Sequence, residues 1–137
     1  MKPIPTLTLG DVMTPSPTTI AIDATLTQAQ SLMHRLGVNH LPVMAGTLVE
    51  SVISARDIER FTLPAHPISE EEEMLVSDIA PARTFAADIA DPLHRVVALM
   101  AERHVGTVIV LNQGELAGIF TEIDALRVLA GLLDGEH

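Results

Sequence analysis

Residues 48–60 read Leu-Val-Glu-Ser-Val-Ile-Ser-Ala-Arg-Asp-Ile-Glu-Arg, and residues 115–127 read Glu-Leu-Ala-Gly-Ile-Phe-Thr-Glu-Ile-Asp-Ala-Leu-Arg. The two stretches lie 67 positions apart, and in each an apolar segment leads to a hydroxyl residue with an aspartate three residues later. This pattern predicts a strand that runs directly into a capped helix. Because the same junction occurs twice, it indicates an internal duplication.

The duplication extends over most of the chain. At the same offset of 67, Asp11 corresponds to Asp78 and Arg60 to Arg127. Further identical pairs are Ile22 and Ile89, Leu26 and Leu93, Leu32 and Leu99, Met33 and Met100, Val38 and Val105, and Val43 and Val110. We expect the register to slip by one only between Val43 and Ser51, since the turn glycine is Gly46 in the first copy and the later-placed Gly114 in the second. Turns tolerate such length changes.

Each copy predicts the element order β-α-β-β-α, hence an α/β (α+β) fold of two tandem units. Thr25 and Gln28 form a capping box for the first long helix, and Asp91 is the expected N-cap of its counterpart, with Pro92 as first helical residue. The predicted strands are 18–22, 40–44, 48–53, 107–111 and 116–120, and the predicted closing helices are 55–61 and 122–130. The first copy spans residues 8–62 and the second spans 74–132, with a proline-containing linker at 63–73. We interpret the acidic run of this linker as the first turn of a helix with Ser69 and Glu72 as capping box, not as a cation site.

Composition excludes several classes of protein. The 137 residues contain no cysteine, which removes disulfides, thiolate catalysis and cysteine zinc sites. Eighteen acidic against eight basic residues give a net charge of −10, which disfavours binding to nucleic acid or anionic membranes. No apolar run is long enough for a membrane span, and we expect a cytoplasmic protein. The histidines lack metal-ligand spacing and no nucleophile is paired with a base, so we expect neither a metal site nor an enzyme. The large apolar fraction of 47% favours self-association.

The repeated hydroxyl and aspartate, Ser54 with Asp57 and Thr121 with Asp124, allow two interpretations. Such a pair at the start of a helix is a capping box, which any helix can use. A carboxylate also accepts two hydrogen bonds, so it matches the 2′,3′-diol of a ribose, and the hydroxyl can bind the same sugar. A nearby helix N-terminus would favour a phosphate. The ligand type that suits these residues is therefore a nucleoside with a phosphate.

Several strings resemble the cystathionine β-synthase (CBS) domain. In the first copy these are residues 9–15 (Leu-Gly-Asp-Val-Met-Thr-Pro), 38–43 (Val-Asn-His-Leu-Pro-Val) and the Ser54-x-x-Asp57 junction. In the second copy they are residues 105–110 (Val-Gly-Thr-Val-Ile-Val) and 118–124 (Gly-Ile-Phe-Thr-Glu-Ile-Asp). The resemblance covers about residues 8–132 in the tandem arrangement called a Bateman module.

This resemblance implies a pair of units packed with pseudo-two-fold symmetry, two clefts for AMP, ADP, ATP or S-adenosylmethionine, and a flat homodimer. It implies ribose-binding roles for Ser54, Asp57, Thr121 and Asp124. It also implies weaker contacts to base or phosphate from Val38, Asn39, His40, Pro42, Arg56, Val105, Thr107, Gly118 and Arg127. We expect that no cofactor is required beyond the adenine nucleotide as ligand, and that Mg²⁺ would offset the charge of di- and triphosphates.

Two departures from the family pattern leave the function open. Glu50 and Ser51 stand where relatives carry Val-Gly, and a side chain at Ser51 would narrow the first cleft. Gly106 and Thr107 stand where a basic residue would contact phosphate in the second cleft, so one or both clefts can be functional. The sequence favours an adenosyl-ligand sensor acting on an unknown regulated protein. The alternative is a homodimeric interaction module that binds no nucleotide.

Overall fold

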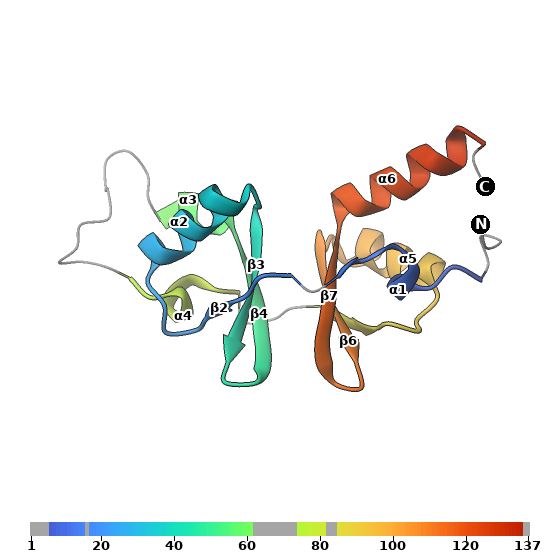
Figure 1. Cartoon of the computed structure of the whole chain (residues 1–137). Helices are drawn as coiled ribbons and strands as arrows, with labels where there is room; N and C mark the ends of the chain where they lie inside the picture. Colours follow the sequence, from blue (N-terminus) through green and yellow to red (C-terminus); the bar gives the residue numbers. More distant parts are fainter. Residues whose placement is uncertain (1–5, 16, 62–73, 82–84, 136–137) are drawn as a thin grey trace. The chain divides into compact units, whose positions relative to one another are not determined.

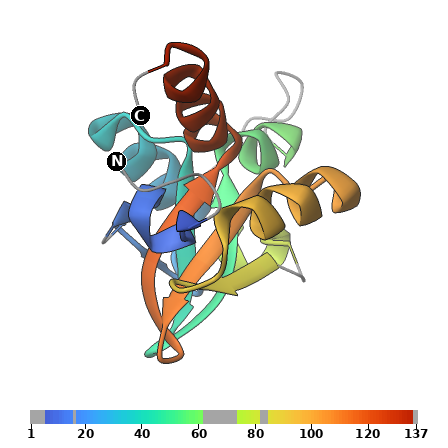
Figure 2. The ribbon, with the colours of Figure 1, turned by 90° about the vertical axis from the view of Figure 1, so that its right-hand side faces the viewer.

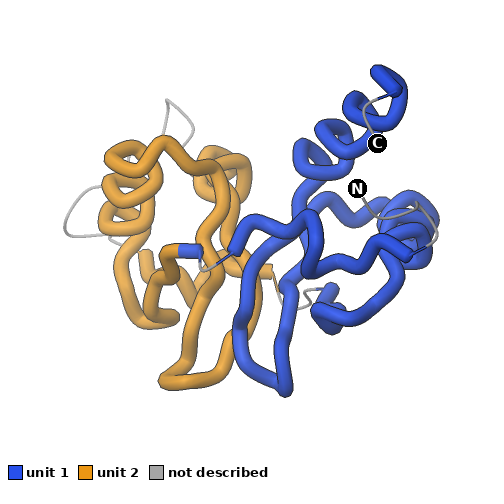
Figure 3. Tube along the Cα trace, turned by 45° about the vertical axis from the view of Figure 1, so that its right-hand side comes forward, with its two compact units in different colours: residues 1–17, 84–137 blue, residues 18–83 orange. Residues whose placement is uncertain are grey.

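The computed structural model describes residues 6–15, 17–61, 74–81 and 85–135. The chain forms two compact units (Figure 3). Unit 2 consists of residues 18–83, and unit 1 consists of residues 1–17 together with 84–137. The expected linker at 63–73, with its predicted Ser69–Glu72 capping box, lies outside the described residues.

Unit 2 is a three-stranded sheet with three helices (Figure 1). Its strand order is β2-β3-β4, with β2 parallel to β3 and β3 antiparallel to β4. The strands are β2 (Ile20–Ala21), β3 (His40–Ala45) and β4 (Leu48–Ser54), and the helices are α2 (Leu26–Leu36), α3 (Ala55–Phe61) and α4 (Val76–Ile79).

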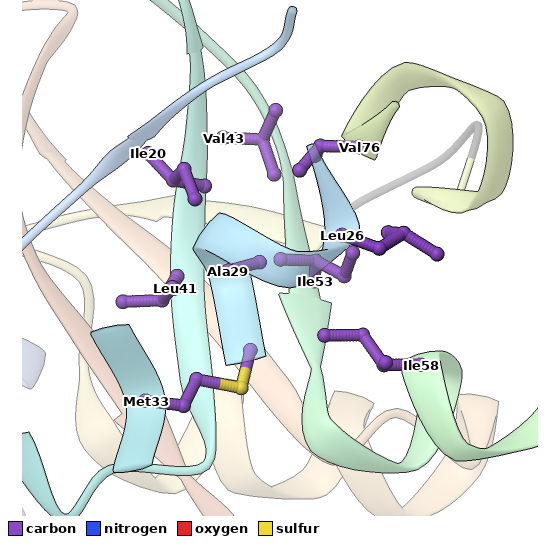
Figure 4. Close-up of a cluster of buried hydrophobic side chains, with 9 residues drawn as sticks. All are labelled: Ile20, Leu26, Ala29, Met33, Leu41, Val43, Ile53, Ile58 and Val76. Atoms are coloured by element: carbon purple, nitrogen blue, oxygen red, sulfur yellow. The ribbon is translucent and has the colours of Figure 1, made fainter. Parts of the chain in front are cut away.

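The core of unit 2 follows from the two periodicities in the sequence. Leu26, Ala29 and Met33 are buried along one face of α2, and Leu41 and Val43 alternate along β3 to meet them (Figure 4). Figure 4 shows the remaining members of this cluster, which are Ile20, Ile53, Ile58 and Val76. The capping box is confirmed: Gln28 N donates to Thr25 Oγ1 at 3.1 Å, and Thr25 N donates to Gln28 Oε1 at 3.0 Å.

Unit 1 repeats this plan and adds one strand. Its strand order is β1-β7-β6-β5. The strands are β1 (Thr14–Pro15), β5 (Phe85–Asp88), β6 (Thr107–Asn112) and β7 (Glu115–Thr121), and the helices are α1 (Leu9–Val12), α5 (Leu93–Arg103) and α6 (Glu122–Leu133). Figure 2 shows the β6–β7 hairpin and α6, which begins where β7 ends. The predicted β-α-β-β-α order is confirmed in both copies. No helix in the described part of the chain is long and apolar enough to cross a bilayer.

The opening segment of each sequence copy belongs to the unit built by the other copy. Leu9 N donates to Asp91 O at 2.9 Å, and 67 residues later Val76 N donates to Ala24 O at 2.7 Å. Two more pairs of bonds obey the same offset: Gly10 N to Ile89 O with Ser77 N to Ile22 O, and Leu93 N to Leu7 O with Leu26 N to Met74 O. The compact units therefore differ from the sequence repeats by a symmetric exchange of residues 7–15 and 74–81.

The expected slip of register in the hairpin is wrong. Ala45 pairs with Leu48 and Asn112 pairs with Glu115, so each turn contains two residues and the offset of 67 is constant. The glycine differs in position because the turns differ in backbone conformation. The first turn has a positive φ at Gly46, whereas the second has positive φ at both Gln113 and Gly114.

The expected N-cap of the second long helix is also wrong. The N-cap of α5 is Pro92, which makes no side-chain capping bond, and the helix begins at Leu93. Asp91 instead accepts a 2.9 Å hydrogen bond from Asp88 N and closes the preceding turn. An aspartate before a proline stabilises a turn as readily as a cap, so sequence alone did not separate the two roles.

Candidate functional site

Both hydroxyl–aspartate pairs act as helix caps. In unit 2, Ser54 N donates to Asp57 Oδ2 at 2.8 Å and Asp57 N donates to Ser54 Oγ at 3.1 Å. In unit 1, Thr121 N donates to Asp124 Oδ2 at 2.9 Å and Asp124 N donates to Thr121 Oγ1 at 3.3 Å. The capping interpretation is thus confirmed. It uses one oxygen of each carboxylate, so it does not exclude a ligand at the other oxygen.

The second oxygen of Asp57 is not used by the cap. Asp57 is partly buried on the first turn of α3, and the structure gives its Oδ1 no hydrogen-bond partner among the described residues. Arg56 is exposed beside it. The junction of β4 and α3 therefore presents an oriented acceptor, and the exposed Arg56 is its neighbour in the sequence.

The carboxylate of Asp124 is enclosed by the chain itself. It is only 8% exposed. Thr14 Oγ1 lies 3.4 Å from Oδ1, and Arg127 reaches the same oxygen at 3.6 Å with a side chain that is 76% exposed. Thr121 Oγ1 donates to Oδ2 at 3.2 Å. A ligand hydroxyl at Asp124 would have to replace one of these contacts.

Thr14 is a residue that sequence reasoning missed. It lies on β1, where it pairs with Ile119 of β7, and it contacts Asp124 only because the opening segments are exchanged. Its position in the Asp-Val-Met-Thr-Pro string marked it as part of the family resemblance, but nothing in the sequence placed it beside an aspartate 110 residues away. The matching position in unit 2 is Pro81, which has no hydroxyl.

Gly118 is required by the exchanged strand. A Cβ at this position would lie 2.7 Å from Met13 Sδ and would also meet the backbone oxygen of Thr14. Ser51 occupies the matching position in unit 2, where it is 3% exposed, and its hydroxyl has no hydrogen-bond partner among the described residues. The two copies therefore differ at this position, as predicted. Gly118 makes room for Met13 and Thr14 of the exchanged segment, and a role of this glycine in ligand binding stays a prediction.

Strands β3 and β6 each begin beside the helix cap of their own unit. His40 pairs with Ser54 across β3 and β4, and Thr107 pairs with Thr121 across β6 and β7. In unit 2, Ala55 N donates to Asn39 O at 2.8 Å, which brings Asn39 to the same place. The structure therefore gathers Asn39, His40, Ser54 and Asp57 at one end of the hairpin.

Other predicted residues lie apart from these clusters. Pro42 pairs with Val52 in the middle of the sheet and is buried, so it does not reach the cap. Val105 is half-buried at the end of α5, where its N donates to Met100 O at 2.9 Å. Val38 lines an open cavity of about 480 Å³ between α2 and α3. Neither Ser54 nor Asp57 lines this cavity, although Asn39 and Ala55 do.

The corresponding place in unit 1 carries an additional acid. The side chain of Glu122 lies against Gly106, close to where a Cβ of that residue would be. Glu122 N also donates to Gly106 O at 3.0 Å, which fixes the two residues together. The matching residue in unit 2 is Ala55. A ligand phosphate at this position of unit 1 would meet a carboxylate, whereas in unit 2 it would meet a methyl group.

The described residues form no cluster of metal-binding side chains. Residues 6–15, 17–61, 74–81 and 85–135 contain no group of three or more His, Asp or Glu side chains that could hold a metal ion. The lack of a requirement for metal stays a prediction for the protein as a whole.

Comparisons with known proteins establish the family. The chain matches the CBS domain twice, over residues 9–63 and 76–131, and it belongs to the CBS domain family as a tandem pair. Its structure is similar to the CBS domain pair of protein MJ0100, solved in complex with 5′-methylthioadenosine and S-adenosyl-L-methionine. The TM-score is 0.77 at 20% identity, covering 93% of this chain and 98% of the other. It is also similar to CBSX2 in complex with AMP, with a TM-score of 0.73 at 20% identity over 91% and 97% of the two chains.

A curated relative extends beyond this pair. The A-adding tRNA nucleotidyltransferase of Geobacter sulfurreducens is 26% identical over 125 residues, which are 91% of this chain but 14% of that protein. The likeness therefore concerns a small part of the enzyme.

Proposed function

We propose that this protein is a regulatory sensor of an adenosyl compound and that Asp57 of unit 2 holds the ribose. The observation that supports this most strongly is the divided carboxylate. Oδ2 of Asp57 caps α3, while Oδ1 has no hydrogen-bond partner among the described residues. The cap fixes the orientation of the acid, so no side-chain freedom is lost when a diol binds. Each charge-assisted bond to the ribose would contribute roughly 1.5–3 kcal/mol.

The ligand of unit 2 carries a phosphate in this proposal. His40 pairs with Ser54 across the hairpin. Ser54 is followed in the sequence by Ala55, which has no charge to repel a phosphate, and by the basic Arg56. AMP suits this site better than ADP or ATP, because a net charge of −10 repels additional phosphates unless Mg²⁺ accompanies them. Crystallised CBS pairs with AMP or S-adenosylmethionine support the class of ligand.

Unit 1 would take an adenosyl compound without phosphate, if it takes a ligand. Glu122 beside Gly106 repels an anion and tolerates a neutral or cationic tail such as a thioether or sulfonium. In this proposal a ribose at Asp124 replaces the long 3.4 Å contact from Thr14, which belongs to β1. Ligand would therefore release the end of the exchanged segment and shift the protein between two conformations that a partner can distinguish.

The alternative is a homodimeric interaction module without nucleotide. The observation that favours it is that Asp124 is already satisfied by Thr14 and Arg127. Both proposals give the CBS pair a regulatory role. We propose that neither version is an enzyme, and that the regulated partner is a protein rather than nucleic acid or membrane.

Calorimetric titration with AMP, ADP, ATP and S-adenosylmethionine, with and without Mg²⁺, separates the two. Asp57→Asn keeps one side-chain oxygen for the cap and loses the charge. It should weaken AMP binding at least about tenfold, the loss expected for one charge-assisted bond, with little change in melting temperature. Asp124→Asn is the matched variant and should leave AMP affinity unchanged. If none of the four ligands gives a binding signal, the sensor proposal is contradicted and the alternative is favoured.

A further inference from the structure

Unit 2 contains an open cavity of about 480 Å³ between two of its helices, here called the α2–α3 cavity. Helices α2 and α3 lie side by side in this unit (Figure 1). Met33 and Ile58 line the cavity, and both belong to the buried cluster of Figure 4, with exposed fractions of 5% and 1%. These two side chains offer an apolar surface to the body of a small molecule.

The rest of the lining is largely polar. Four polar side chains come from α2, from the turn that follows it and from α3, namely Gln30, His34, Asn39 and Glu59. All four are exposed, so they are free to meet a molecule that enters from solvent. An apolar surface combined with a small number of polar groups is typical of sites for small ligands.

The second sequence copy shows that the fold does not require these polar groups. Three of them correspond, at the offset of 67, to apolar residues. The pairs are Gln30 and Val97, His34 and Ala101, and Glu59 and Leu126. The buried side of the cavity, in contrast, is apolar in both copies, since Met33 corresponds to Met100 and Ile58 to Ala125. The polar lining is therefore particular to unit 2, as expected if it serves a ligand and not the packing of the two helices.

The residue that ends the helix also differs between the copies. Gly37 caps α2 with a φ of 67°, lines the cavity, and has no atom within 4 Å of the place where a Cβ would be. The corresponding residue of unit 1 is His104, which caps α5 with a φ of 55° and has an exposed side chain. Both residues adopt the left-handed conformation, but only glycine leaves the space at the end of the helix open.

The charge of the lining favours a cation. Among the nine residues that line the cavity, Glu59 has the one formal charge. Helix α2 ends at this cavity, and the C-terminus of a helix has a partial negative charge. The net charge of −10 acts in the same direction over the whole molecule. A carboxylate or phosphate ligand would be repelled here.

We propose that the α2–α3 cavity binds a small organic cation with an apolar body, such as a primary amine on a short aliphatic chain. The ammonium group lies beside Glu59, and the aliphatic chain contacts Met33 and Ile58. An ammonium group donates three hydrogen bonds, and the amide oxygens of Gln30 and Asn39 are acceptors for those that Glu59 does not take. Asp57 does not line this cavity, so the site is separate from the proposed ribose site and does not depend on it.

Three probes with the same aliphatic chain separate the effect of charge from that of apolar contact: hexylamine, 1-hexanol and hexanoate. Each is titrated into the protein labelled with ¹³C at its methionine methyl groups, and the Met33 signal reports on the cavity. Hexylamine should shift this signal in a saturable way and bind about threefold more tightly than hexanol, the ratio expected for one exposed ion pair. Hexanoate should leave the signal unshifted. Met100, the corresponding residue of unit 1, is the internal control and should not respond to hexylamine.

Substitutions then test the role of the carboxylate. Glu59→Gln keeps the size of the side chain and removes its charge, so hexylamine and hexanol should bind to this variant with equal affinity. Glu102→Gln, at an exposed acid of α5 in unit 1, is the matched control and should retain the threefold preference. A triple variant with the residues of the second copy, Gln30→Val, His34→Ala and Glu59→Leu, should bind hexanol at least as well as hexylamine.

Three results would overturn the inference. The first is a Met33 signal that none of the probes shifts, which would mean that the cavity takes no ligand of this class. The second is equal affinity of the parent protein for hexylamine and hexanol, since the cavity would then not select for charge. The third is an unchanged preference for hexylamine in Glu59→Gln, which would place the ammonium group away from this carboxylate.

Discussion

Gly118→Ala should destabilise the protein by displacing the exchanged strand. The new methyl group would lie 2.7 Å from Met13 Sδ and would press on the backbone of Thr14. Backbone has no alternative rotamer, so β1 must move away from β7 and lose its pairing at Pro15. Overpacking of this kind costs about 1–3 kcal/mol. At roughly 4 °C per kcal/mol for a domain of this size, the melting temperature should fall by about 4–12 °C.

Gly131→Ala is the matched control for the same chemical change. Gly131 lies in α6, and no atom lies within 4 Å of its missing Cβ. Alanine in a helix interior is more favourable than glycine by about 0.5–1 kcal/mol, so this variant should melt slightly higher than the parent. Thermal and urea unfolding of the three proteins provide the measurement. If Gly118→Ala unfolds like the parent, the close approach of Met13 and Thr14 does not exist and the exchange is refuted.

Two further predictions concern the positions at which the copies differ. Ser51→Ala should stabilise the protein by about 1 kcal/mol, because it removes a buried hydroxyl that has no hydrogen-bond partner among the described residues; an unchanged or lower urea midpoint would show that the hydroxyl is satisfied. Glu122→Gln should raise the number of AMP molecules bound per chain from one to two by removing the carboxylate beside Gly106, with Glu115→Gln as control; calorimetric stoichiometry measures this, and one site in both variants would contradict it.

The helices and strands were predictable because each copy encodes them in patterns of residues that are close in the sequence. The Thr25–Gln28 capping box, the three- and four-residue spacing of Leu26, Ala29 and Met33, and the strand-to-helix junction at Ser54 all act within a few residues. Duplication then provides an independent check, since a second copy with different side chains preserves the same pattern.

The exchange of opening segments was not predictable. The bonds of Leu9 to Asp91 and of Val76 to Ala24 join backbone groups, and backbone bonds leave no side-chain signature. For the same reason Thr14 escaped the predicted site, and Gly118 was interpreted as space for a ligand rather than for β1. The prediction of the hairpin register was wrong because the later position of the second glycine was interpreted as a longer turn. The position of a turn glycine instead indicates which residue of the turn has a positive φ.

Everything in the proposed function depends on a contact between the Asp57 carboxylate and the ribose hydroxyls. The most direct measurement is a double-mutant cycle: AMP and 2′-deoxy-AMP are each titrated into the parent protein and into Asp57→Asn. We predict that removal of the 2′-hydroxyl weakens binding to the parent at least about tenfold and changes binding to Asp57→Asn by less than about twofold, because the partner is already lost. Equal losses in both proteins would mean that Asp57 does not hold the sugar.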